Sequence, residues 1–187
     1  MTTPTEFAGA AQAVAAALQA AAVDPADGVR LLATLADFSP AVATPASEIG
    51  AAMATMQTAE GALFRRAALV AMCRASADYQ PASYDDAVTL RVRLAALLDA
   101  EIQRAGDDGS DATFAALRAL RAAVVQDLTA RGASLARMQQ VEVAASLPAP
   151  VLAQRLYRDA TRADDLVLQA NPPHPAFMPR TFTALNS

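Results

Sequence analysis

The stretch "LAQRLYRDATRADDLVLQANPPHPAFMP", residues 152–179, differs from the alanine-rich sequence that precedes it. It holds two short helical patterns, at about 150–158 and 161–170, followed by a proline-rich tail. On either side lie segments that alternate polar and apolar residues, 139–144 and 181–185, as half-buried strands do. The order therefore predicts a strand, two helices and a second strand, with the two strands paired.

Upstream of this module, residues 6–79 predict three helices separated by capping residues and prolines. The Asp-Pro pair at 24–25 is typical of an N-cap followed by the first helical position. The segment "SPAVATPAS" at 39–47 holds two prolines and predicts a linker. Ser47 is then the expected cap of a long helix that ends near Tyr79.

Residues 83–132 predict a helical hairpin. Ser83 is its expected N-cap, and large apolar residues then recur at steps of three and four in both arms. They are Leu90, Leu94, Leu97, Leu98 and Ile102 in the first arm, and Phe114, Leu117, Leu120, Val124 and Leu128 in the second. We expect the charged residues of the hairpin on solvated outer faces. These are Arg91, Arg93, Asp99, Glu101, Arg104, Arg118 and Arg121.

The composition agrees with helix-on-helix packing. Alanine inflates the apolar fraction of 54%, aromatic residues make up 5% and tryptophan is absent, which disfavours a bulky sheet core. We expect a mainly α fold in three parts. An acidic helical segment covers residues 1–46, a long helix and the hairpin cover 47–134, and the strand-helix-helix-strand module covers 135–187.

Charge and hydropathy argue against two kinds of partner. The net charge is −4, and residues 1–60 hold one arginine against six acids, so the rest carries +1. No segment is basic enough for strong phosphate contacts, so DNA is possible as a partner but is not indicated by charge. The run "FAGAAQAVAAALQAAAV" at 7–23 lacks a basic leader and contains two glutamines. We therefore expect no membrane insertion.

No group of side chains predicts catalysis, a metal or another cofactor. His174, the single histidine, is enclosed by three prolines, and a hydrogen-bonding or stacking role in a surface turn suits it best. One cysteine, Cys73, excludes an internal disulfide and predicts a buried thiol. Three acid pairs lie at helix starts or in a loop, where the helix macrodipole explains most of them. They are Asp85/Asp86, Asp107/Asp108 and Asp164/Asp165.

The opening stretch resembles the C-terminal signature of the DNA circularisation proteins of Mu-like phages and prophages, which are tail- and baseplate-associated proteins. The family pattern runs roughly L-A-x-R-L-Y-G-D-A-x-R-A-D-E-L, then an Asn, then H-P-G-F-x-P. The matching residues are Leu152, Ala153, Arg155, Leu156, Tyr157, Asp159, Ala160, Arg162, Ala163, Asp164, Leu166, Asn171, His174, Pro175, Phe177 and Pro179. The resemblance covers about residues 63–180.

Some features depart from this pattern. Arg158 and Ala176 stand where the pattern has glycine, and Pro172 and Pro173 precede the histidine in place of other residues. Family members also have a further N-terminal domain that these residues lack, so its role is not carried over. The same stretch is similar to LysM modules in its order of elements, although Arg158 makes the turn between the helices less like a sugar-binding one.

The resemblance implies a non-enzymatic structural component of a Mu-like phage tail or related contractile particle, at the baseplate or hub. Such a protein would be made in the bacterial cytoplasm and located in the virion. It would contact other tail proteins as a homo-oligomer or in several copies. Two alternatives stay open: a DNA-end-binding protein that acts on injected phage DNA, and a LysM-type peptidoglycan binder.

The same hypothesis assigns roles within the module. Asp159 or Thr161 is expected to cap the second short helix, and Arg155 and Arg162 to pair with acids or with a partner. Two aromatic residues are expected to anchor the packing. The full set of expected structural and docking residues is Arg155, Tyr157, Asp159, Arg162, Asp164, Asn171, His174 and Phe177, of which Tyr157 and Phe177 are the aromatic anchors.

Overall fold

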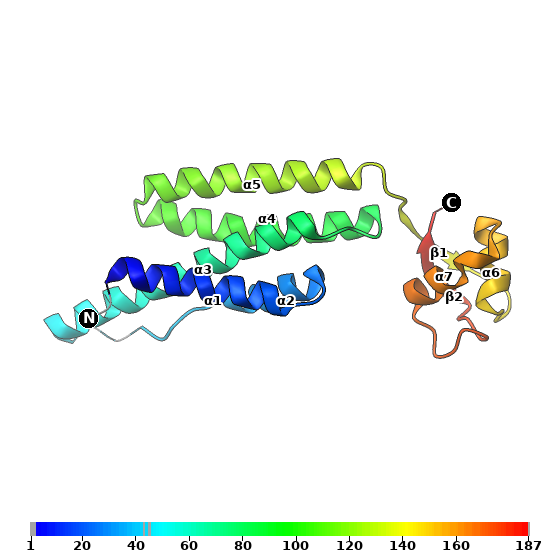
Figure 1. The fold of residues 1–187 in the computed structure, drawn as a ribbon, viewed down its shortest axis with the longest axis horizontal. Coiled ribbons are helices and arrows are strands. Elements are labelled where there is room, and N and C mark those ends of the chain that lie inside the picture. The colour runs from blue at the N-terminus through cyan, green and yellow to red at the C-terminus, as the bar shows by residue number, and fades with distance from the viewer. Residues whose placement is uncertain (1–2, 43, 45, 187) are drawn as a thin grey trace. The chain divides into compact units, whose positions relative to one another are not determined.

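A computed structural model of the chain describes residues 3–42, 44 and 46–186. The described chain is mainly helical and has a small two-stranded antiparallel sheet near its C-terminus, as predicted (Figure 1). It forms two compact units. The helical unit comprises Met1–Gln80 and Thr89–Thr129, and the C-terminal unit comprises Pro81–Val88 and Ala130–Ser187.

Local capping explains where the first three helices begin. They are α1 (Pro4–Ala21), α2 (Pro25–Ala36) and α3 (Glu48–Asp78). Thr3 and Glu6 form a reciprocal capping box at α1. The predicted caps of the next two helices are confirmed: Asp24 accepts from the Ala26 N–H at 2.8 Å, and Ser47 accepts from the Gly50 N–H at 3.1 Å.

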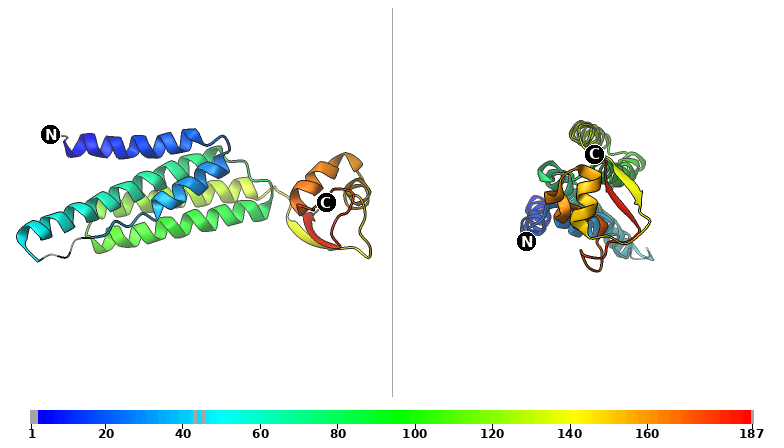
Figure 2. Two further views of the ribbon diagram at one scale, coloured as in Figure 1. Left: turned by 90° about the horizontal axis from the view of Figure 1, so that it is seen from below. Right: turned by 90° about the vertical axis from the view of Figure 1, so that its right-hand side faces the viewer.

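The predicted hairpin is formed by α4 (Tyr84–Asp107) and α5 (Asp111–Gly132), which lie side by side and antiparallel (Figures 1 and 2). Gly109 adopts a φ of +66° in the turn between them, a conformation that costs glycine little. Within the helical unit, Asp99 of α4 pairs with Arg121 of α5 at 2.6 Å. Arg91 of α4 donates to the Thr129 hydroxyl of α5 at 2.8 Å.

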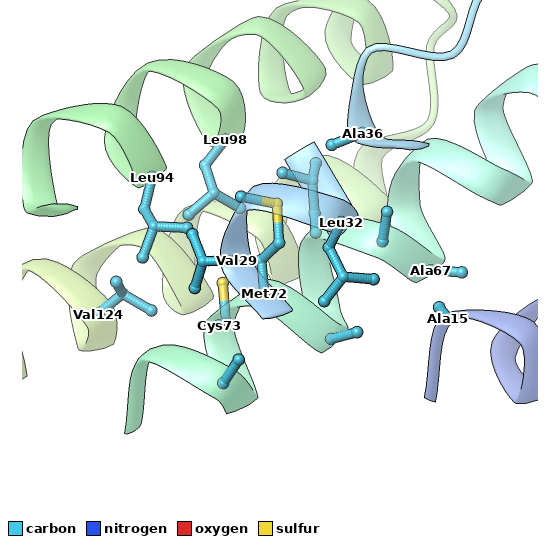
Figure 3. Close-up of a cluster of buried hydrophobic side chains, with 14 of the residues drawn as sticks. Ala15, Val29, Leu32, Ala36, Ala67, Met72, Cys73, Leu94, Leu98 and Val124 are labelled. Carbon is cyan, nitrogen blue, oxygen red and sulfur yellow. The ribbon is translucent and has the colours of Figure 1, made fainter. Parts of the chain in front are cut away.

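One hydrophobic core joins all five helices α1 to α5 within the helical unit. Leu32, Met72 and Leu98 are fully buried in it, and Figure 3 shows their side chains close to Cys73. The predicted apolar stripes of the hairpin are confirmed, because each of their residues is buried or packs against this cluster. Cys73 is buried as predicted, and burial raises the pKa of its thiol to about 11. Many of the remaining contacts in the core come from alanines.

Glu101 corrects the prediction of a fully solvated charged face on the hairpin, because its side chain is 0% exposed. It accepts from Arg65 Nε at 3.0 Å and from Arg66 Nε at 2.8 Å, both on α3, and from Arg104 Nη1 at 3.2 Å. Arg65 also donates to the Phe38 carbonyl at 3.1 Å. A single buried carboxylate therefore ties α3 and α4 together beside the apolar core.

The burial of Glu101 follows from its position along α4. It lies seven residues after Leu94, three after Leu98 and four before Ala105, and all three of these are fully buried. This spacing puts Glu101 on the core-facing stripe. An ionised carboxylate in such a place needs several charged or polar donors, which the three arginines supply.

We expect Glu101→Gln to lower the free energy of unfolding by about 3 kcal/mol, because three arginines would lose their buried counter-charge. Asp99→Asn removes an exposed pair and should cost at most about 0.5 kcal/mol. Urea unfolding followed by circular dichroism measures both losses. Equal losses for the two variants would contradict the structural role given to Glu101.

Candidate functional site in the C-terminal unit

The C-terminal unit contains the strand-helix-helix-strand order that the sequence predicts. Its elements are β1 (Met138–Glu142), α6 (Ala149–Tyr157), a 3₁₀ turn η1 (Ala160–Arg162), α7 (Ala163–Ala170) and β2 (Thr181–Leu185). The two strands pair antiparallel, with Val141 opposite Phe182 (Figure 1). A separate small core fills this unit. It consists of Ala149, Leu152, Ala153, Leu166, Met178, Phe182 and Ala184.

The first turn of α4 also belongs to this unit, which the sequence did not predict. The Tyr84 N–H donates to the Ala136 carbonyl at 2.9 Å, and the Met138 N–H donates to the Asp85 carboxylate at 2.6 Å. The Arg137 guanidinium lies over the Tyr84 ring, 4.3 Å from its centroid. These contacts hold the start of β1 against the beginning of α4.

The turn between α6 and α7 is formed by Arg158 and by Asp159 of the candidate site. Arg158 ends α6 in a left-handed conformation, with φ 58° and ψ 24°, at the position where the resembled pattern has glycine. Asp159 then accepts from both the Thr161 N–H at 2.9 Å and the Thr161 hydroxyl at 2.6 Å. It therefore caps η1, the turn that leads into the second helix, whereas α7 itself begins after Arg162 without a side-chain cap, so the predicted capping is confirmed for this turn alone. These hydrogen bonds lower the pKa of the Asp159 carboxyl.

Tyr157 and Arg162 pack against each other across this turn. The Arg162 guanidinium lies 4.0 Å from the centre of the Tyr157 ring, and its Nε lies 3.6 Å from an Asp165 oxygen. The predicted pairing of Arg162 with an acid is confirmed. Tyr157 is half-buried against the unit's core, as expected of a packing anchor. Burial raises the pKa of its phenol, an effect that Arg162 and the backbone of Leu185 oppose.

The proline-rich tail forms a surface turn around His174. Asn171 ends α7 in a left-handed conformation with φ 43°, which asparagine tolerates better than most residues. His174 Nδ1 accepts from the Ala176 N–H at 3.0 Å, and its ring is tilted against Phe177 with centroids 6.0 Å apart. The predicted hydrogen-bonding and stacking role of His174 is therefore confirmed.

The prediction that Phe177 anchors the packing is wrong. Its side chain is 71% exposed, and the neighbouring Met178 is fully buried in its place. The Met178 N–H donates to the Leu147 carbonyl at 3.2 Å, and its own carbonyl accepts from the Ser146 hydroxyl at 2.8 Å. Because both backbone groups of Met178 are fixed, its side chain enters the core and that of Phe177 is left outside.

Two charged residues of the candidate site lie on its surface. Arg155 on α6 is exposed and forms no ion pair with any residue that the structure describes. Asp164 is exposed in the first turn of α7, where a negative charge interacts favourably with the helix dipole. Leu168 of α7 is 85% exposed. Arg155, Asp164 and Leu168 thus lie on the solvent-exposed surface of the unit, outside its hydrophobic core.

No model of a known protein family matches the sequence, and a search of curated proteins finds no match either. Within the described residues, no three or more His, Cys, Asp or Glu side chains cluster closely enough to hold a metal ion. None of the helices in the described part of the chain is both long and apolar enough to cross a membrane.

We expect Arg158→Gly to stabilise the C-terminal unit by about 0.5–1 kcal/mol, because glycine adopts the left-handed conformation without strain. Arg155→Gly makes the same chemical change inside α6 and should destabilise the unit by about 1 kcal/mol. Hydrogen exchange of the backbone amides in α6 and β2 measures both changes. A loss of protection in Arg158→Gly would show that the side chain of Arg158 matters more than its backbone.

Proposed function

We propose that this chain is a non-enzymatic structural component of a Mu-like phage tail or a related contractile particle, where it acts as an adaptor at the baseplate or hub. It would be made in the bacterial cytoplasm and incorporated into the particle. The C-terminal unit would be the part that docks on neighbouring tail proteins.

The first support is what the residues matching the phage-tail pattern do in the fold. Asp159 caps η1, Asn171 ends α7, and His174 holds a surface turn. Tyr157 and Arg162 pack on each other. These side chains stabilise turns and packing, as expected of a module with a structural role.

The second support is the order of elements in the C-terminal unit. A strand, two short helices and an antiparallel partner strand form the arrangement that the resemblance to LysM modules implies. The exposed Arg158 occupies the turn between the helices, a position where glycine would leave the surface open. This bulky cation favours a protein-contacting adaptor over a shallow sugar-binding groove.

The observation that carries the proposal is the exposed surface left once the unit's core is complete. Phe177 and Leu168 are 71% and 85% exposed, and Arg155 has no ionic partner among the described residues. We expect these two side chains to form part of an apolar contact surface of the kind that marks protein-protein interfaces. Arginine and aromatic residues are also the types most often found at the centres of such contacts.

The proposal is tested with particles induced from the bacterium that carries this gene. We expect the chain to co-sediment with purified tails at a constant ratio to the tube protein, as measured by mass spectrometry across a density gradient. Phe177→Ala should reduce its incorporation by about tenfold or more. Val23→Ala, which alters a fully exposed apolar residue of the helical unit, is the matched control and should have no effect.

Absence of the chain from purified particles would contradict the proposal. Two further assays separate the alternatives. A gel shift at low salt would support a DNA-end-binding protein, and we expect none because no segment is strongly basic. Co-sedimentation of the full chain with purified peptidoglycan would support the LysM-type binder, and we expect the chain to remain in solution.

A further inference from the structure

The first half of α3 has an apolar face that the described chain does not cover. The buried residues of α3 begin only at Gly61. Before that point, Ile49 and Met56 are 75% and 72% exposed, and Met53 is also largely exposed. These residues follow one another at steps of four and three, so they share one face of the helix. A row of large apolar side chains of this kind is unusual on an isolated surface.

This face continues into a groove between α1 and α3. The groove has a volume of about 720 Å³, within the range of clefts that enclose another group. Phe7 and Ala8 of α1 and Met56, Ala59, Glu60 and Leu63 of α3 line it. Methionine side chains are flexible and adapt to the shape of an inserted helix or side chain. The groove is therefore suited to an apolar occupant.

The lining of the groove carries a negative charge at Glu60 and a positive charge at Arg66. Glu60 lines it and follows Met56 on the same face of α3, and no described residue forms an ion pair with it. Glu6 lies next to Phe7, and its hydrogen bonds with Thr3 lower the pKa of its carboxyl. Arg66 at the edge of the groove donates its Nε to the buried Glu101. A basic residue on the occupant would complement Glu60, at the part of the groove away from this arginine cluster.

These charges argue against a symmetric contact in which the groove of one copy meets the groove of another. Such pairing would place the exposed segments of two α3 helices antiparallel, with Glu48 of one copy close to Glu60 of the other, so like charges would meet. The occupant should instead offer an apolar side chain flanked by free cations. The outer face of α6 does so, with Val151 exposed beside Arg155 and Arg158.

We propose that the groove between α1 and α3 binds the outer face of α6 from a second copy of this chain, with Val151 entering the groove and Arg155 facing Glu60. The two surfaces differ, so the contact joins copies head to tail and builds rings or linear chains. The contact is small, so we expect weak association with a dissociation constant on the order of 10–100 µM. The proposal goes beyond the tail role, since the purified chain alone can show it.

Sedimentation velocity of the purified full chain over a range of concentrations tests this proposal. We expect the average mass to rise with concentration and to fall when salt screens the Arg155–Glu60 attraction. Glu60→Arg and Arg155→Glu should each weaken association by about tenfold or more. A mixture of these two variants should associate again, because each supplies the charge that the other lacks.

Matched substitutions control for the change in net charge. Asp78→Arg changes an exposed acid at the last residue of α3, and Arg180→Glu changes an exposed arginine just before β2. Both variants should associate like the wild type. Circular dichroism and thermal unfolding confirm that each variant is folded. A wild-type chain that stays monomeric at every concentration would overturn the proposal. So would association that survives both charge reversals, or a mixture of the variants that stays monomeric.

Discussion

The fully buried carboxylate of Glu101 is the constraint on which the helical unit depends. Helices faced with alanine bury little apolar area at each contact, so each contact contributes little hydrophobic stabilisation. Glu101 adds a fixed ionic link between α3 and α4 through Arg65, Arg66 and Arg104. Because the carboxylate is fully buried, it needs these donors in a specific geometry, and Arg65 extends the link to the Phe38 carbonyl. This link holds α3 in place at Arg65 and Arg66. The exposed first half of the same helix ends just before these residues.

The C-terminal unit has only a small hydrophobic core, so polar contacts contribute more to its fold. Its polar side chains hold the backbone at the turns: Asp159 after α6, Asn171 after α7 and His174 in the tail. The beginning of α4 supplies Tyr84 and Asp85 as further supports for β1. With its turns fixed from within, the unit leaves Phe177 and Arg155 exposed outside a complete core.

Local signals in the sequence predicted most of the elements. The caps at Asp24 and Ser47, the apolar stripes of the hairpin and the two short strands depend on residues within a few positions of one another. Glu101 was misjudged because its arginine partners on α3 lie 35 and 36 residues away. Its position on the stripe between Leu98 and Ala105 was the available signal. The sequence does not show which of the adjacent residues Phe177 and Met178 enters the core. Backbone hydrogen bonds of Met178 with Ser146 and Leu147 place Met178 there.

Hydrogen exchange of the chain, alone and inside a purified particle, tests the central claim most directly. We propose that the exposed surface of the C-terminal unit contacts a neighbouring subunit and that the chain is not an enzyme. The account predicts that amides in the tail at 172–179 and in α6 become protected on assembly. Equal exchange of these amides in the free and assembled chain would contradict it.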